Sequence, residues 1–223
     1  MWQEVLSVLF PKRCINCDLI IPFHQKFVCE SCSSVLPFTG IPFSSDNYLK
    51  EKINNHVKIE YASSLLIFKK NNITQKLVHY LKYKNCPEIG SWMAEIWFEL
   101  NKNNSNLKQI DYVVPVPIHY KRFEKRTYNQ IELCAETLSK LLNCTYEPQI
   151  LKRIYHLDSQ TNSGKWERLQ RIQGAFQKNI SKKGHFLLVD DVLTTGATLI
   201  ACATELLKTE ETKISIFTLS SAQ

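Results

Sequence analysis

One stretch of thirteen residues, Phe186–Thr198, constrains the fold more than any other part of the sequence. It opens with four apolar residues, a run typical of a strand buried on both faces of a parallel sheet. The carboxylates Asp190 and Asp191 follow where we expect the strand to end, before a run of small hydroxyl residues around Gly196. Residues 199–208 then have the apolar pattern of a helix. The stretch therefore predicts a strand, a short loop and a helix N-terminus at the carboxyl edge of an α/β sheet.

The loop of this stretch has the chemistry of an anion site. The segment Thr194, Thr195, Gly196, Ala197, Thr198 offers backbone N–H groups, hydroxyl donors and a glycine that permits close approach. The preceding carboxylates suit sugar hydroxyls or a hydrated metal ion. A simpler interpretation is that the acidic pair ends a strand and a threonine caps a helix. The sequence is neither a Walker loop nor a dinucleotide-binding glycine motif.

Four cysteines near the N-terminus form two C-x2-C pairs, Cys14 with Cys17 and Cys29 with Cys32, separated by eleven residues. Two such knuckles supply the four thiolates that structural zinc requires. The apolar residues around them are too few for a core, so a metal would explain how the segment holds a shape. Redox dithiols and core cysteines are the alternatives. We expect His24, which lies between the pairs, to be a surface residue.

Composition sets the remaining limits. The 223 residues suffice for one α/β domain and a small appendage, and the net charge of +7 favours an anionic partner. The first ten residues have no basic region before the apolar ones and carry Glu4, so we expect neither a signal peptide nor membrane insertion. We therefore expect a cytoplasmic protein with reduced thiols. The cysteines outside the two pairs are expected to pack as small hydrophobic residues: Cys86, Cys134, Cys144 and Cys202.

The rest of the chain alternates strand and helix patterns. Strands are expected at 59–68, 110–117, 146–151 and 213–219, and helices at 73–81, 89–100 and 129–142. Residues 38–57 have the composition of a connector. We therefore place an N-terminal module and connector at 1–57 and an α/β domain at 58–223.

Two basic segments are candidates for anion binding. Residues 118–126 follow the strand at 110–117, where a sheet binds ligands, although such a run is commonly only a solvated face. Residues 152–173 are polar, basic and poor in core residues. Such a long segment fits either a lid over an anionic substrate or a plain mobile surface loop.

Taken together, these features resemble the ComF family of competence proteins, over nearly the whole chain. The motifs that carry the likeness are the cysteine pairs, Val114-Pro115-Val116-Pro117, the basic stretch ending Tyr128-Asn129-Gln130, Ser159-Gln160-Thr161, Glu167-Arg168, Gly174-Ala175-Phe176 and the stretch Phe186–Thr198. Thr127 stands where that family has glycine, and Arg171 where it has asparagine. The stretch itself looks like the phosphoribosyl-pyrophosphate (PRPP) motif of type I phosphoribosyltransferases.

The resemblance implies a type I phosphoribosyltransferase fold, a mainly parallel sheet flanked by helices with a mobile hood loop, after a small zinc-binding module. It implies that Asp190 and Asp191 hold the ribose of PRPP–Mg²⁺ and that residues 194–198 hold its 5′-phosphate. The site residues expected to serve the pyrophosphate group are Val116, Pro117, Ile118 and His119, with Arg153 and Arg168 closing over the leaving group.

Two hypotheses about function follow from the resemblance. In the first, the chain transfers phosphoribosyl from PRPP to a nitrogen acceptor and releases pyrophosphate, within a DNA-uptake system. In the second, it is a non-catalytic adaptor that uses the fold to bind a partner helicase or single-stranded DNA. The sequence shows no residue identifiable as an acceptor-activating base, so it does not decide between them.

Overall fold

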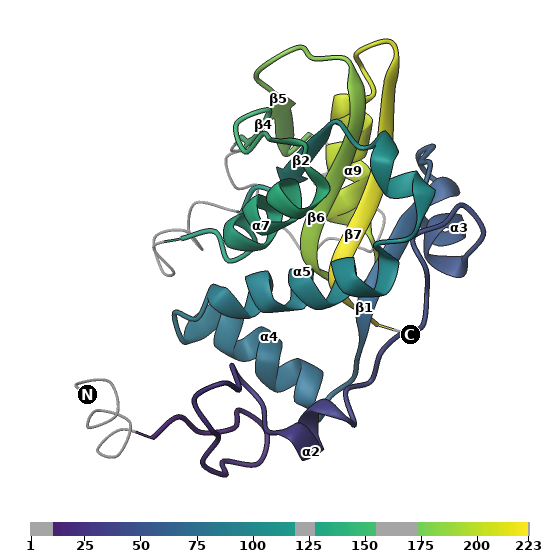
Figure 1. The fold of residues 1–223 in the computed structure, drawn as a ribbon. Coiled ribbons are helices and arrows are strands. Elements are labelled where there is room, and N and C mark those ends of the chain that lie inside the picture. The colour runs from purple at the N-terminus through teal and green to yellow at the C-terminus, as the bar shows by residue number, and fades with distance from the viewer. Residues whose placement is uncertain (1–10, 119–127, 155–173, 223) are drawn as a thin grey trace, which may run out of the picture.

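A computed structural model describes residues 11–118, 128–154 and 174–222. Its main sheet has five parallel strands in the order β1-β7-β6-β2-β3 (Figure 1). These strands are β1 (Ala62–Phe68), β2 (Tyr112–Pro115), β3 (Thr145–Tyr146), β6 (Gly184–Leu193) and β7 (Thr212–Ala222). The sheet is flanked by helices, which confirms the predicted α/β fold class.

Apart from α2 (Glu30–Ser33) in the cysteine-containing segment, the helices of the described residues lie against one or the other face of the sheet. They are α3 (Tyr48–Asn54), α4 (Ile73–Tyr83), α5 (Glu88–Asn101), α7 (Glu132–Leu142) and α9 (Ala197–Leu206), with a 3₁₀ turn at Ser105–Gln109. One apolar cluster joins α4, α5 and α7 to strand residues such as Leu187 and Phe217. A second cluster joins α3 and α9 to Leu188 and Ile216. Because side chains alternate along a strand, β6 and β7 contribute to both clusters.

A separate antiparallel ribbon pairs β4 (Leu151–Arg153) with β5 (Phe176–Lys178). The single strand predicted at 146–151 is therefore wrong, because β3 ends at Tyr146 and β4 belongs to this second sheet. Pro148 lies between them in a turn, and proline has no N–H to donate to a strand ladder. The long polar loop was predicted at 152–173, but Lys152 and Arg153 belong to β4, where they pair with β5. The rest of that segment, residues 155–173, lies outside the described residues.

The cysteine-containing segment packs against α4 and α5 (Figure 1). The rings of Phe27 and Trp92 are 5.5 Å apart between centroids, and the Lys76 ammonium donates to the Asn16 carbonyl at 2.6 Å. The predicted connector contains a helix, α3, that shares the second apolar cluster with the larger sheet. The division of the chain at residue 57 stays a prediction.

Candidate functional site

Both carboxylates of the acidic pair lie inside β6. The strand was predicted to end at Val189, but it continues to Leu193 because its ladder with β7 continues, pairing Asp190 with Thr218 and Val192 with Ser220. The predicted strand end is therefore wrong by four residues. Since neighbours on a strand point to opposite faces, the two carboxylates cannot share one environment.

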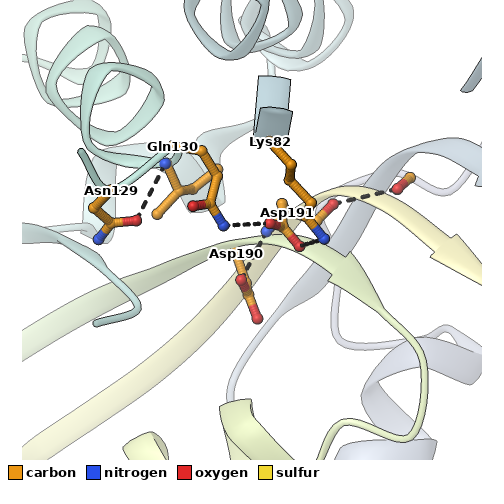
Figure 2. A network of polar contacts seen from close by, with 7 residues as sticks. Lys82, Asn129, Gln130, Asp190 and Asp191 are labelled. Atoms are coloured by element: carbon orange, nitrogen blue, oxygen red, sulfur yellow. Dashed lines mark hydrogen bonds and ion pairs between the residues drawn. The ribbon is translucent and has the colours of Figure 1, made fainter. Parts of the chain in front are cut away.

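Asp191 points to the face covered by α4 and α7, where it is 6% exposed (Figure 2). The Lys82 ammonium, from the last turn of α4, lies 2.9 Å from Asp191 Oδ1. The Gln130 side-chain amide donates to Asp191 Oδ2 at 2.6 Å. A buried carboxylate is tolerated when it is paired and hydrogen-bonded in this way. Asp191 therefore ties the end of β6 to two segments on one face of the sheet.

Asp190 points to the opposite face, toward α9 (Figure 2). Its Oδ1 accepts the backbone N–H of Asp191 at 2.8 Å, and the residue is half-buried. Burial raises the pKa of the Cys202 thiol on α9, the Asp190 charge raises it further, and the Arg153 charge opposes this. The charges of Asp190 and Arg153 therefore both act on Cys202, on the α9 side of the sheet.

The loop after β6 turns sharply into α9. Gly196 has a φ of 81° and precedes the first residue of the helix, so this position needs the left-handed conformation that glycine adopts without strain. The Ala197 N–H donates weakly to Thr195 Oγ1 at 3.4 Å, and Thr194 and Thr195 are exposed. The loop and helix N-terminus thus form the predicted arrangement, with donors available to an anion.

The segment that follows β2 lies beside β6, the strand that leads into this loop. The Val116 N–H donates to the Val189 carbonyl at 2.9 Å, while Pro117 and Ile118 are half-buried. The Asn129 side chain donates to the Val116 carbonyl at 3.2 Å, which brings the segment before α7 back to the same edge. His119 lies outside the described residues.

Of the two arginines predicted to close over the leaving group, only Arg153 is described. It lies at the end of β4 with its guanidinium 5.1 Å from the centroid of the Phe176 ring, within the range of a cation–π contact. Arg168 lies outside the described residues.

Sequence reasoning missed three polar residues that surround the acidic pair and its loop. Lys82 belongs to a Lys-Tyr-Lys run that resembles an ordinary solvated helix end, and Gln130 entered the sequence analysis only as part of the motif Tyr128-Asn129-Gln130. Lys52 lies in the predicted connector, yet its ammonium donates to the Thr194 carbonyl at 2.6 Å. The sequence around each of these residues does not indicate its contact, because the partner is distant in the sequence.

The four paired cysteines come together as one cluster. The sulfur atoms of Cys14, Cys17, Cys29 and Cys32 lie within 4.8 Å of one another, and the Sγ atoms of Cys17 and Cys29 are 3.6 Å apart. Ligands of a tetrahedral zinc with Zn–S bonds of about 2.3 Å would be separated by about 3.8 Å. The donor set therefore fits a structural zinc ion. His24 is exposed and lies outside the cluster, as expected.

Hydrogen bonds to the sulfurs support this interpretation. Burial raises the pKa of the Cys14 thiol, but backbone N–H groups of Cys17, Cys29 and Asn16 outweigh burial and lower it to about 6. The Asn16 side chain donates to Cys32 Sγ at 3.3 Å, which lowers the pKa of that thiol, but burial and the neighbouring cysteine sulfurs raise it overall to about 12. Donors of this kind stabilise the thiolates that bind a metal.

Comparison with known proteins agrees with the resemblance seen in the sequence. The chain is 38% identical to competence protein ComFC of Bacillus subtilis, over 86% of this chain and 83% of that protein. It is 28% identical to competence protein F of Haemophilus influenzae, over 85% of this chain and 88% of that protein. No family model matches the chain.

A likeness to solved structures is weaker. Adenine phosphoribosyltransferase from Saccharomyces cerevisiae aligns with a TM-score of 0.36 and 14% identity, over 60% of this chain and 68% of that one. Nothing about the chemistry of the site follows from it.

Among the described residues, no helix has the length and apolar character needed to cross a membrane. The identity and coverage shared with ComFC confirm the resemblance seen in the sequence. This chain belongs to the ComF family of competence proteins.

Proposed function

We propose that the chain binds PRPP with Mg²⁺ at the carboxyl end of β6. The observation that carries this proposal is the separation of the acidic pair. Asp191 is held by Lys82 and Gln130 on one face, while Asp190 lies on the other face, followed by the Gly196 turn and the α9 N-terminus. A carboxylate followed along the chain by an anion-binding loop suits a sugar phosphate. The sugar hydroxyls can donate hydrogen bonds to the carboxylate, and the phosphate can accept them from the loop.

Each residue then has a role. Asp190 accepts hydrogen bonds from the ribose hydroxyls, and Thr194–Thr198 donate to the 5′-phosphate. Asp191 is a positioning residue, because its oxygens already bind Lys82 and Gln130. We assign the pyrophosphate group to the segment from Val116 to His119, with Arg153 and Arg168 neutralising its charge. Mg²⁺, when bound with PRPP, would spread the negative charge of the pyrophosphate.

In the reaction that such a site would support, the bond between ribose C1 and the pyrophosphate oxygen breaks. Pyrophosphate leaves with the electron pair, a nitrogen of the acceptor bonds to C1, and that nitrogen loses a proton. The positive charge that develops on the ribose would lie near the Asp190 carboxylate, which favours it electrostatically. We place this activity in the cytoplasm, in the handling of DNA taken up during natural transformation; the relatives' names, which call them competence proteins, support a role in competence.

A second candidate is a non-catalytic adaptor in the same uptake system. The cysteine module exposes Leu19, Ile20 and Phe23, each more than 60% accessible. Exposed apolar side chains close together are typical of a protein interaction surface. In this alternative, the module binds a partner helicase or single-stranded DNA, and the α/β domain binds PRPP without transferring it.

Calorimetric titration of the full chain with PRPP and Mg²⁺ tests the common part of both candidates. We expect Asp190→Asn to weaken binding about tenfold, the loss of roughly one charge-assisted hydrogen bond. Asp46→Asn, at an exposed position, serves as the matched control and should bind as the wild type does. Absence of PRPP binding by the wild type would overturn the proposal. Pyrophosphate release with candidate nucleobases then separates the enzyme from the adaptor.

A further inference from the structure

The short helix α3 is firmly attached to the sheet. Leu49 and Ile53 are 1% and 0% exposed and belong to the same apolar cluster as α9. At the start of α3, the Asn47 side chain accepts the Lys50 N–H at 3.0 Å and donates to the Ala62 carbonyl of β1 at 2.9 Å. The helix is therefore held at both its cap and its apolar face, in spite of the connector-like composition around it.

This helix also contacts the loop that follows β6. A Cβ atom placed on Gly196 would lie 2.5 Å from Ile53 Cδ1, so the end of the Ile53 side chain would have to shift. Glycine is thus favoured at position 196 by its positive φ, and a larger residue there would also displace the Ile53 side chain of α3. The loop that we assign to the 5′-phosphate is consequently shaped by a helix that lies more than 140 positions earlier in the sequence.

Lys52 precedes this contact residue and bonds directly to the loop. Its ammonium donates to the Thr194 carbonyl at 2.6 Å. The five residues Thr194–Thr198 supply hydroxyls and backbone N–H groups but no cationic side chain. A phosphate monoester carries a charge of about −1.5 to −2 near neutral pH, whereas a helix N-terminus supplies only about half a positive charge. An anion in this loop would therefore benefit from a full positive charge beside it.

We propose that Lys52 is the phosphate-binding cation of this site, and that α3 forms one wall of it. The ammonium offsets the negative end of the Thr194 carbonyl and adds the charge that the loop lacks. This inference rests on the proposed function and adds a specificity element to it. Lys52 favours a ribose that carries a 5′-phosphate, while the opposite end of the site, with Arg153, recognises pyrophosphate.

Binding of ribose 5-phosphate and of pyrophosphate with Mg²⁺, each measured by calorimetry on the full chain, tests the assignment. We expect Lys52→Gln to weaken ribose 5-phosphate binding about tenfold and to leave pyrophosphate binding within about twofold, since only one end of the site loses charge. Lys52→Arg should retain most of the affinity because the charge remains. Lys50→Gln, the same change on the same helix, should alter neither ligand. Melting temperatures of all variants establish that they are folded.

The outcomes separate this inference from the proposed function. Wild-type affinity for ribose 5-phosphate in Lys52→Gln would overturn the role of Lys52 and leave PRPP binding intact. Equal losses for ribose 5-phosphate and pyrophosphate would also overturn it, since they would indicate a general distortion of the domain. A wild-type chain that binds neither ribose 5-phosphate nor PRPP would overturn the proposed function and this inference with it.

Discussion

The cysteine cluster and the acidic pair are organised over very different distances along the chain. The cluster draws its four sulfurs from two short segments that lie close together in the sequence. Asp191, in contrast, is held by Gln130, 61 positions away, and by Lys82 on a different helix. A site made of local segments keeps its geometry when bound to one ion, whereas a site made of distant segments depends on the whole sheet. The two regions should therefore fail independently.

Metal removal should produce the largest effect and confine it to the cysteine module. A structural zinc site can contribute about 10 kcal/mol to folding, more than the few buried apolar residues of this segment are expected to supply. We expect chelation, or Cys32→Ser, to abolish protection from hydrogen exchange in residues 11–36 while β6 and β7 keep theirs.

Cys86→Ser is the matched control for this experiment, because Cys86 lies outside the sulfur cluster. The purified variant should retain about one zinc ion per chain, as we expect of the wild type. If β6 exchanged as readily as the module after chelation, the two regions would be one cooperative unit.

Removing the counter-charge of Asp191 should have the next largest effect, this time confined to the sheet. Lys82→Met leaves a carboxylate that is 6% exposed, with the Gln130 amide as its remaining side-chain partner among the described residues. Loss of one partner from a buried ion pair typically costs about 3–5 kcal/mol. We expect Lys82→Met to lower the free energy of unfolding, measured with urea, by about 3 kcal/mol. The zinc content should be unchanged.

Lys102→Met removes a comparable lysine from an exposed ion pair with Glu99, in which both side chains are more than 50% accessible. Its cost should be below about 1 kcal/mol. Equal destabilisation by the two variants would mean that the Lys82–Asp191 pair contributes no more than a surface pair does.

The same contrast explains which features could be predicted from the sequence. The cysteine cluster follows from spacing alone, and the strand, loop and helix of residues 186–198 follow from hydrophobic pattern and glycine chemistry. The end of β6 was misplaced because polar residues usually signal a strand end. Here the ladder with β7 continues through both aspartates.

The contacts of Lys52 and Lys82 could not be predicted, because each depends on how the helices pack across the sheet. A lysine near a helix end has the same local pattern whether it faces solvent or a buried carboxylate. Burial of Leu49 and Ile53 likewise depends on α9, which is distant in the sequence. Local chemistry thus identified the loop and the acidic pair, while the residues that support them became visible only in the fold.

Mild acid should affect both regions, through different groups and with the smallest effect in the sheet. In the cysteine module, protons compete with the metal for thiolates. At the amino end of β6, His185 is 3% exposed, its Nε2 lies 2.8 Å from Ser215 Oγ and its Nδ1 has no hydrogen-bond partner among the described residues. Burial lowers the pKa of His185 from its ordinary value of 6.5. The charges of Glu60 and Asp111 raise it, and the charge of Lys213 lowers it.

Because the pKa of His185 is lower in the folded chain, the unfolded chain binds a proton first as the pH falls through about 6.5. The contribution of neutral His185 to stability is thus fully present above that pH and is lost below it. We expect the melting temperature of the sheet, followed with zinc in excess, to fall between pH 7.5 and 5.5. His185→Gln should reduce this slope, while His56→Gln, at an exposed position, should not. Parallel profiles for His185→Gln and the wild type would assign the acid sensitivity of the sheet to other groups.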